Sequence, residues 1–437
     1  MTSLSTPKAT NRRWFILIPV ASVMYLLAFF DRTNLSFVLP YMGEDLGLSN
    51  TDKGLVSGIF FIGYLLLQVP AALLAQRWSA KYTILILMIC WGLAAIWTGL
   101  VRDTSELFLA RFVLGFFEGG VQPATLVLLS KWFPQREKAR ASGFWLLCIP
   151  FAAIIAAPIT GGLLSIVHWR TVLVLEGLPP LVWAIVWLFI IADRPSKARW
   201  LPSTERDTIE HALAEDEAIK KDTISGSVRY RDAIKNPKVI GLILAWFFYN
   251  AGFYGFTLWL PQVIKDLTGG TPAFVGFVTA IPYVVGLVFM IVISVRTDRH
   301  GSRRFTVLVP LTISALALLL GQFAGVTGLQ FALLCVVAGG LYVHGAFFAL
   351  PPLLLRTEIL AVALGLIGGL GNLGGFVGPY VVGWLIDATG TPAAGFGLMA
   401  VSLLIAGICM ATVTPRRVRQ DPASTESPQA PAAGTRR

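Results

Sequence analysis

Five ionisable side chains stand inside stretches of the chain that are otherwise apolar: Asp31, Arg32, Arg111, Glu118 and His344. A charge in the hydrocarbon core of a bilayer costs about 2.5–3.5 kcal/mol on insertion scales, so such residues usually mark functional sites. An arginine in a low-dielectric site can give two parallel hydrogen bonds to a carboxylate. A buried carboxylate beside it can load and release a proton. These residue types predict a site for an organic anion and protons.

Arg32 is the natural anchor for a substrate carboxylate. Asp31 and Arg32 are adjacent, so on a helix their side chains point about 100° apart and cannot face the same spot. One of them is expected to face the cavity while the other contacts a neighbouring helix. The alternative is that Arg32 only neutralises Asp31 or Glu118 in a structural pair.

Glu118 follows Arg111 by two helical turns on the same face, and Gln122 continues that polar stripe. The spacing favours Glu118 as a proton carrier, with a packing salt bridge as the alternative. Arg111 lies nearer the expected outer face, and we expect its role to be structural. Glu176, near the outer end of its span, is a borderline case.

Uncharged polar groups in the spans add candidates for substrate contacts. Tyr64 and Gln68 are one helical turn apart, and Asn372 lies in a glycine-rich stretch where helix backbones approach closely. All three can offer hydrogen bonds to hydroxyl or carboxylate oxygens, or can serve only as hydrogen bonds between helices. His344 is a candidate second cation for a diacid, or a proton relay, with simple packing as the alternative.

The elements that carry these residues are predicted from composition and run length. Hydrophobic residues make up 55% of the 437 residues and charged residues 14%, too few to cover a soluble domain, where about 25% are charged. Many apolar runs are near the roughly 20 residues that span a bilayer. We therefore predict an all-α membrane protein of twelve transmembrane helices. They are expected at 12–41, 52–76, 82–101, 106–132, 140–166, 171–192, 239–264, 273–295, 304–324, 329–355, 359–386 and 393–414.

The net charge of +11 is explained by its distribution, without a nucleic-acid partner. Only Lys53, Arg102, Arg170 and Lys265 fall in loops on one side, whereas the segments on the other side hold nearly all remaining Lys and Arg residues. The positive-inside rule therefore predicts a multi-pass protein of the cell inner membrane with both termini in the cytoplasm.

A charged, proline-containing segment divides the chain. We predict an N-terminal half at 1–192, a cytoplasmic linker at 193–238 with a helix around 205–221, a C-terminal half at 239–414 and a disordered cytoplasmic tail at 415–437.

The sequences of the two halves also repeat each other at an offset of 221–222 residues. The matching pairs include Pro40 with Pro261, Asp45 with Asp266, Pro158 with Pro379, Gly143 with Gly365, and Gly161 with Gly383. A duplicated six-helix unit predicts alternating access around a central site.

The turn Asp298-Arg299-His300-Gly301-Ser302-Arg303 resembles the signature loop of the major facilitator superfamily, as do the two six-helix halves and the charged linker. The first copy of the turn departs from the pattern, with Gln76 in place of the usual acid and Ser79 in place of the usual glycine. The resemblance implies two pseudo-symmetric six-helix bundles and gating roles for Asp298, Arg299, Gly301 and Arg303.

Further strings resemble the anion:cation symporter family, in the branch of tartrate, phthalate and hydroxyphenylacetate permeases. They include residues 30–35 (FDRTNL), 111–118 (RFVLGFFE), 175–179 (LEGLP) and 371–379 (GNLGGFVGP). This resemblance implies proton coupling by Asp31 and Glu118 and polar ligand contacts at Tyr64 and Asn372. Phe29 stands where many sugar-acid carriers have Tyr, and Trp145 adds a further apolar group near the cavity. Both favour an aromatic or less hydroxylated acid.

Together these observations predict a proton-coupled symporter that imports a small organic carboxylate: a sugar acid, a dicarboxylate or an aromatic acid. The alternative within transport is proton-driven efflux of a drug or metabolite. The chain lacks clustered catalytic motifs, metal-ligand spacing and a Gly-rich phosphate loop, so we expect no enzyme, no cofactor and no metal site. The expected partners are the organic anion, protons and the lipid bilayer, and the protein is expected to be a monomer.

Overall fold

The computed structural model describes residues 11–223, 230–300, 303–348, 350–355 and 357–413, with side chains described except at 219–231, 294–304, 357, 358 and 361. Regular structure in these residues is helical throughout. The N-terminal half contains α1 (Arg12–Leu46), α2 (Asn50–Leu74), the π-helix η1 (Ala75–Ser79), α3 (Ala80–Leu100), α4 (Thr104–Gly119), α5 (Val121–Ser130), α6 (Gln135–Leu146), α7 (Cys148–Leu164) and α8 (Trp169–Ile190).

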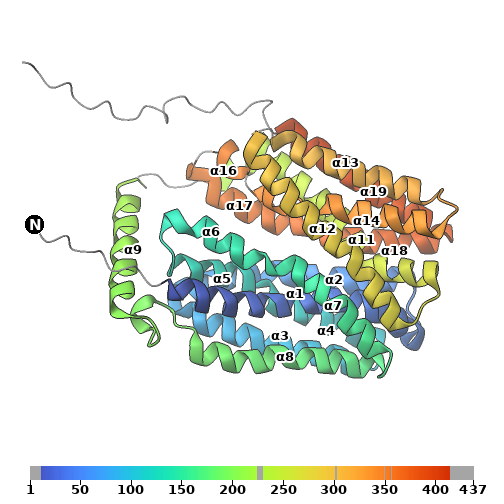
Figure 1. The fold of residues 1–437 in the computed structure, drawn as a ribbon, viewed down its shortest axis with the longest axis horizontal. Coiled ribbons are helices and arrows are strands. Elements are labelled where there is room, and N and C mark those ends of the chain that lie inside the picture. The colour runs from blue at the N-terminus through green and yellow to red at the C-terminus, as the bar shows by residue number, and fades with distance from the viewer. Residues whose placement is uncertain (1–10, 224–229, 301–302, 349, 356, 414–437) are drawn as a thin grey trace, which may run out of the picture.

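The linker contains the 3-10 helix η2 (Pro195–Lys197), α9 (Ser203–Thr223) and α10 (Tyr230–Lys235). The C-terminal half contains α11 (Pro237–Thr268), α12 (Pro272–His300), α13 (Arg303–Gly321), α14 (Thr327–Leu341), α15 (His344–Phe348), α16 (Pro351–Leu354), α17 (Thr357–Asn372), α18 (Gly374–Thr389) and α19 (Pro392–Val413). Figure 1 shows the first half as one layer of long helices and the second half as another layer beside it.

Ten helical segments of the described chain are long and apolar enough to cross a bilayer. One of them, Asn50–Leu100, contains two predicted spans, and the shorter apolar helix Phe305–Gly321 is counted apart from the ten. The segments thus match all twelve predicted spans. The predicted turn at 76–81 is instead helical, because α2 continues through η1 directly into α3. Ser79 still caps α3 by accepting a hydrogen bond from the backbone N–H of Tyr82.

Four predicted spans are interrupted by a break. The span 106–132 breaks at Gly120, 140–166 at Leu147, 329–355 at Tyr342–Val343, and 359–386 at Leu373. The breaks at Gly120 and Tyr342 lie 222 residues apart, which is the offset of the sequence repeat. This pair of corresponding spans is therefore interrupted at corresponding places, whereas the breaks at Leu147 and Leu373 do not match at that offset.

Close packing of α2 on α4 places the polar stripe of α4 beside α2. A Cβ atom at Gly115 would meet the backbone of Phe60, and one at Gly119 would meet the backbone of Tyr64. Glycine at these two positions lets the helix axes approach until backbone touches backbone. Glu118, between them in sequence, is consequently held next to the residues of α2 with no exposed surface.

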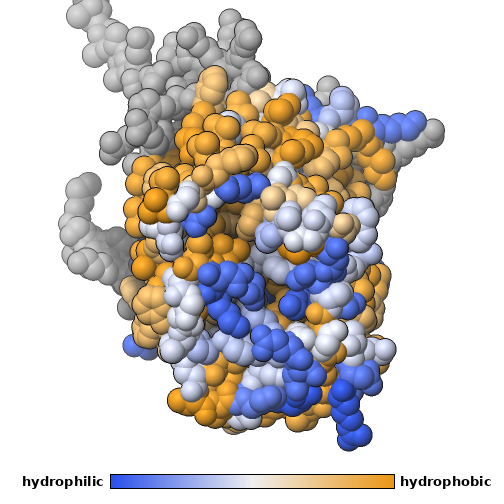
Figure 2. Space-filling model, turned by 90° about the vertical axis from the view of Figure 1, so that its right-hand side faces the viewer, coloured by the Kyte–Doolittle hydropathy of each residue, from blue (hydrophilic) through white to orange (hydrophobic). Residues whose placement is uncertain are grey.

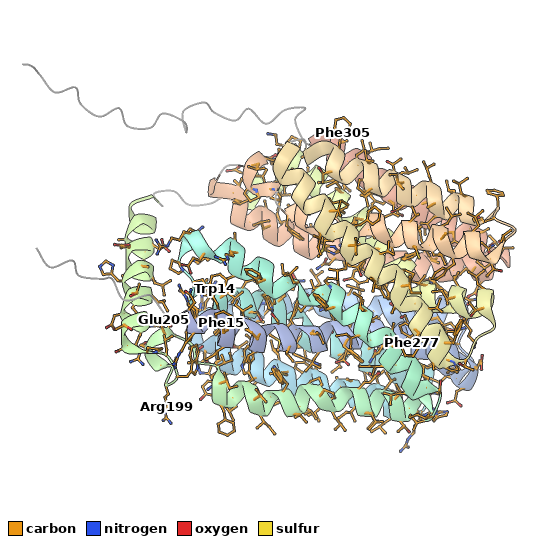
Figure 3. All side chains as sticks on the ribbon, viewed as in Figure 1. Trp14, Phe15, Arg199, Glu205, Phe277 and Phe305 are labelled. Carbon is orange, nitrogen blue, oxygen red and sulfur yellow. The ribbon has the colours of Figure 1, made fainter. Side chains whose placement is uncertain are left out.

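The linker helix α9 runs across the end of the bundle where α1 begins (Figure 1). The Glu205 carboxylate of α9 accepts hydrogen bonds from the backbone N–H groups of Arg12, at 3.2 Å, and Arg13, at 3.5 Å. Figure 3 shows Glu205 near Trp14 at the start of α1. Three turns further along α9, Asp216 accepts from the backbone N–H of Gln135 at 2.5 Å. One linker helix therefore caps both α1 and α6.

The opposite end of the bundle, where α1 ends and α2 begins, is called the outer end here, following the predicted topology. Figure 2 shows hydrophilic residues gathered on this end and hydrophobic residues along the sides. Along α2, none of the residues from Asn50 to Leu65 is exposed, whereas Leu66, Val69, Pro70, Leu73 and Leu74 are. The α2 helix is therefore well covered near the outer end and less covered toward the other end.

Candidate functional site

Arg32 and Glu118 form a buried ion pair between α1 and α4. The Nε of Arg32 donates to Oε1 of Glu118 at 2.8 Å. The side chains are only 9% and 0% exposed, so the pair lies almost entirely out of water. Within the described residues, Nη2 of Arg32 and Oε2 of Glu118 are buried without a hydrogen-bond partner. The pair therefore uses one hydrogen bond where a bidentate arginine–carboxylate pair would use two.

Three aromatic rings surround the Arg32 guanidinium. Its Cζ lies 4.5 Å from the ring centroid of Phe29, 4.7 Å from that of Tyr64 and 5.2 Å from that of Phe60. These separations are within the range of cation–π attraction. The rings hold the cation in an apolar setting that strengthens any contact with an anion.

Asp31 is placed apart from Arg32, as the helix geometry predicts. It is 2% exposed, and its Oδ2 lacks a hydrogen-bond partner in the described part of the chain. Its charged neighbours are Glu118, Glu176 and Arg111. The structure thus places Asp31 within electrostatic range of the Arg32–Glu118 pair, but Arg32 pairs with Glu118 and not with its sequence neighbour.

Arg111 is buried beside the same aromatic group. Its Nε donates to the backbone carbonyl of Val56 at 3.4 Å, and its Cζ lies 5.3 Å from the centroid of Phe60. Phe60 therefore contacts the guanidinium groups of both Arg32 and Arg111. Arg111 thus contacts the α2 backbone, and its structural role stays a prediction.

Tyr64 connects α2 to α5, which begins directly after the break at Gly120. Its hydroxyl donates to Oε1 of Gln122 at 3.2 Å, one helical turn from Glu118. Gln68, one turn further along α2, is half-buried. Tyr64 therefore joins the cluster around Arg32, and Gln68 extends it toward the less covered part of α2.

Asn372 lies at the break between α17 and α18, and its side chain hydrogen-bonds two residues of α11 in the same half. Its Oδ1 accepts from the indole Nε1 of Trp246 at 3.1 Å and from Nδ2 of Asn250 at 3.3 Å. Asn250 also donates to the backbone carbonyl of Gly371 at 3.2 Å. Asn250 is not among the residues predicted from the sequence, although an amide within an apolar span is a signal that could have identified it.

His344 begins α15 directly after the break in the predicted tenth span. The Tyr249 hydroxyl donates to the Leu341 carbonyl at 2.6 Å and lies 3.1 Å from Nδ1 of His344. Because the tyrosine proton is committed to Leu341, we expect Nδ1 of His344 to donate to Tyr249. The rings of Trp246 and Phe253 are each 5.4 Å from the His344 ring, so the imidazole lies in an aromatic cluster.

Tyr254 of α11 lies between the cluster around Arg32 in the N-terminal half and the aromatic cluster around His344 in the C-terminal half. It interacts with Arg32, and its ring lies 4.4 Å from that of Phe61 on α2. Tyr254 is also absent from the predicted residues, because a tyrosine in an apolar span carries no distinctive signal. Trp145 was expected near the cavity, and this stays a prediction. Its fully buried ring packs 4.5 Å from Tyr25 inside the N-terminal half.

Glu176 lies in a separate buried cluster. It accepts hydrogen bonds from Nδ2 of Asn34 at 2.9 Å and from Oγ1 of Thr160 at 2.7 Å. All three side chains are at most 5% exposed. Glu176 thereby joins α8 to α1 and α7, and its partner Asn34 lies one turn after Asp31 on α1.

The signature-loop residues fall partly outside the described residues. Nothing is described of Gly301 or of the side chains of Asp298, Arg299 and Arg303. In the first copy of the turn, Asp193 supplies an acid from the start of the linker. Its carboxylate accepts from Oγ of Ser79 at 2.5 Å and from the backbone N–H of Lys81 at 3.0 Å.

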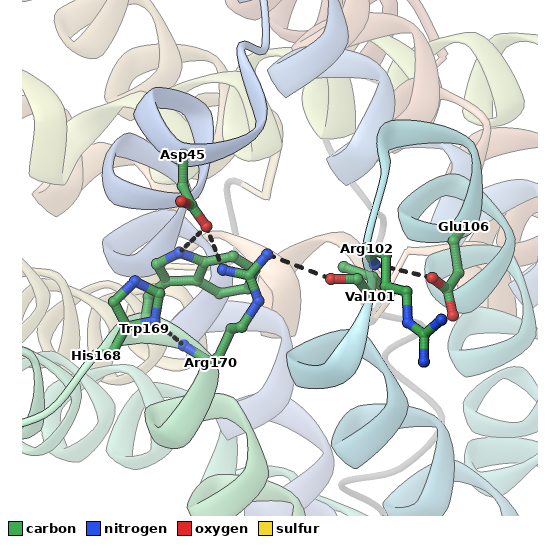
Figure 4. Close-up of polar contacts among 7 residues, drawn as sticks. All are labelled: Asp45, Val101, Arg102, Glu106, His168, Trp169 and Arg170. Carbon is green, nitrogen blue, oxygen red and sulfur yellow. Dashed lines mark hydrogen bonds and ion pairs between the residues drawn. The ribbon is translucent and has the colours of Figure 1, made fainter.

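A polar network at the outer end joins the loops of the N-terminal half (Figure 4). Asp45 accepts from Arg170 and from the indole N–H of Trp169, and Arg170 also reaches the Val101 carbonyl. Beside it, Glu106 accepts from the backbone N–H of Arg102 at 2.8 Å. These contacts lie at the ends of α1, α3 and α8 and do not reach the Arg32 cluster.

Comparisons with known proteins identify the family of the chain. The Major Facilitator Superfamily model matches residues 21–270 and 261–436. A putative tartrate transporter of Agrobacterium vitis is 32% identical over 403 residues, covering 90% of this chain and 88% of the relative. A quinolone resistance transporter of Acinetobacter baumannii is 31% identical over 424 residues, covering 95% and 97%.

Among solved structures, the inward-open xylose transporter XylE of Escherichia coli superposes with a TM-score of 0.74. It is 15% identical, and the match covers 93% of this chain and 97% of the transporter. The fold is therefore that of two six-helix bundles. The chain belongs to the major facilitator superfamily, among its anion:cation symporter-like members, and is a membrane transporter and not an enzyme.

Proposed function

We propose that this protein is a proton-coupled symporter that imports a small organic carboxylate by alternating access. The observation that carries the proposal is the ion pair of Arg32 and Glu118, which is joined by one hydrogen bond at 2.8 Å although its geometry could offer two. The unpartnered Nη2 of Arg32 can donate to an incoming carboxylate. The aromatic rings of Phe29, Phe60 and Tyr64 provide an apolar wall beside the cation.

Coupling follows from competition for one guanidinium. Protonation removes the charge of Glu118 and weakens its bond to Arg32, which then takes the substrate carboxylate. A proton on Glu118 therefore favours substrate binding, and by reciprocity bound substrate favours the proton. Asp31, buried nearby with an unpartnered oxygen, is the second proposed proton carrier. In this way the substrate anion and a proton cross together.

The far side of the substrate is proposed to meet the C-terminal half. Tyr254 approaches Arg32 from α11, and Asn372 and His344 belong to the aromatic cluster around Trp246. Together with Tyr64 and Gln68, these side chains supply hydrogen bonds for the remaining polar groups of the substrate. A ligand held between both halves can drive their relative movement, which is the basis of alternating access.

The remaining assignments concern placement in the cell. We propose an inner-membrane location, cytoplasmic termini, a monomeric state and the four-part division of the chain, supported by the charge asymmetry of the loops.

We also propose a gating role for four residues of the signature loop, Asp298, Arg299, Gly301 and Arg303. The weaker coverage of α2 beyond Leu65 supports access from the cytoplasmic side in this conformation.

Uptake into proteoliposomes tests the function. Purified protein is reconstituted, and a panel of radiolabelled sugar acids, dicarboxylates and aromatic acids is offered with and without an inward proton gradient. We expect gradient-stimulated accumulation of at least one carboxylate. Absence of stimulated transport for every carboxylate of the panel would refute the proposal.

Proton-driven efflux of an aromatic drug is a second candidate, favoured by one relative that is a quinolone resistance transporter. The cluster of Trp246, Tyr249, Phe253 and His344 could stack a planar ring. The same liposomes, loaded with a fluoroquinolone and given the same inward proton gradient, separate the two functions, because an efflux antiporter takes in a proton as the drug leaves. Gradient-driven loss of drug without carboxylate uptake would favour efflux.

A further inference from the structure

Asp387, near the end of α18, binds the beginning of α2 in the other half of the protein. Its Oδ1 accepts from the backbone N–H of Asn50 at 3.2 Å and from Nδ2 of the same residue at 2.8 Å. Its Oδ2 accepts from the backbone N–H of Thr51 at 2.7 Å and from Oγ1 of Thr51 at 2.6 Å. A carboxylate of the C-terminal half thus caps a helix of the N-terminal half, where helix N–H groups favour negative charge.

A second cap occupies the equivalent place on the other side of the molecule. Oγ of Ser165, just after α7, accepts from the backbone N–H of Ala273 in the first turn of α12 at 2.9 Å. Ser165 precedes Asp387 by 222 residues, and Thr51 precedes Ala273 by the same 222 residues. The two caps are therefore related by the internal repeat.

The helix contacts beneath the two caps repeat as well. A Cβ at Gly54 would meet the backbone of Pro379, and one at Gly276 would meet the backbone of Ala157. Each residue of the first pair lies 222 residues from its counterpart in the second. Gly383 against Asn50 and Gly161 against Pro272 form another pair of this kind. The α2–α18 and α7–α12 interfaces thus repeat the same contacts, and in both of them the helices pack backbone to backbone near the outer end.

The two caps differ in strength. Asp387 accepts four hydrogen bonds with a charged group, and charge-assisted hydrogen bonds are the stronger kind. Ser165 accepts with a neutral hydroxyl. Its target helix begins with Pro272, which has no N–H to offer, whereas Asn50 at the equivalent position offers two donors.

We propose that these two caps are paired latches that hold the outer end of the transporter closed, with Asp387 as the dominant latch and Ser165 as the weaker one. The inference rests on the proposed alternating access, since it requires the halves to separate at the outer end. Opening outward must then break the Asp387 cap, and weakening the cap shifts the population toward the outward-open state.

Spin labels on the two halves measure this population directly. Ile166 and Phe323, 77% and 86% exposed at the outer end of opposite halves, are replaced by labelled cysteines after the four native cysteines are substituted. Asp387→Asn keeps the size of the side chain, but its amide nitrogen cannot accept from Thr51. The matched control is Asp52→Asn, because Asp52 forms a capping box with Ser49 at the same helix start but within one half.

We expect Asp387→Asn to increase the ratio of long to short label distances about fivefold, as for the loss of a helix cap. Ser165→Ala should have a smaller effect, and the double variant a larger one. Asp52→Asn should leave the distances unchanged. An unchanged distribution in Asp387→Asn, or an equal shift in Asp52→Asn, would overturn the proposal. The measurement needs no substrate, so failure of the carboxylate assignment would leave this result interpretable.

Discussion

Arg32 and Glu118 lie on different helices and meet through one hydrogen bond of 2.8 Å in a setting from which water is almost fully excluded. A second possible hydrogen bond is left unmade, because Nη2 of Arg32 and Oε2 of Glu118 are both unpartnered. In a low-dielectric site such a pair binds firmly enough to be specific, yet it leaves a donor for a competing carboxylate. Predictions for the site follow from this geometry.

Substitution of Arg32 by Ala is expected to abolish substrate binding. Truncating one partner of a buried charge pair costs about 2–5 kcal/mol, so affinity should fall by at least about thirtyfold. Isothermal titration with the best substrate of the uptake panel measures this change. Arg111→Lys is the control, since Arg111 donates its hydrogen bond to the Val56 carbonyl and the lysine keeps the positive charge, so it should retain affinity. Unchanged affinity in Arg32→Ala would show that the anchor is another residue.

Substitution of Glu118 by Gln is expected to separate exchange from accumulation. Glutamine keeps the shape but cannot carry a proton, so internal and external substrate should still exchange while a proton gradient no longer drives net uptake. Both activities are measured in the same proteoliposomes. Glu176→Gln is the control, because Glu176 is also buried but bonds to Asn34 and Thr160. Accumulation that survives in Glu118→Gln would assign coupling elsewhere.

Glu205→Ala is expected to destabilise the N-terminal half. Its carboxylate accepts from the first backbone N–H groups of α1, and loss of a helix cap costs about 1 kcal/mol in the free energy of unfolding. The apparent melting temperature in detergent should therefore fall. Glu210, exposed on the same helix, provides the matched control Glu210→Ala. Equal melting temperatures for both variants would argue against the cap.

Gly119→Ala is expected to disturb the packing of α2 on α4. The added Cβ would meet the backbone of Tyr64, and overpacking of this kind costs about 1–3 kcal/mol in the free energy of unfolding. Because Glu118 is adjacent, substrate affinity should fall as well. Gly162→Ala is the control, since its Cβ would meet nothing within 4 Å. The check is thermal unfolding together with binding, and a neutral Gly119→Ala would contradict the packing.

The sequence alone predicted the fold class correctly, because a membrane constrains composition strongly. Apolar run lengths identified the twelve spans, and the offset of 221–222 residues identified the duplicated unit. The charged residues of the site were also recognisable, since Asp31, Arg32 and Glu118 interrupt runs that are otherwise apolar. Such signals are local in the chain and need no knowledge of how the helices pack.

Only the tertiary structure decided which of these residues meet. Arg32 pairs with Glu118, 86 residues away, and not with the adjacent Asp31, because the rotation of α1 against α4 sets the partner. Tyr254 and Asn250 were added to the candidate site only through the position of α11. The caps of Asp387 and Ser165 likewise exist only where helix ends of the two halves touch. Hydrophobic pattern determines that helices form and span, whereas side-chain interdigitation between helices determines which polar groups are brought together.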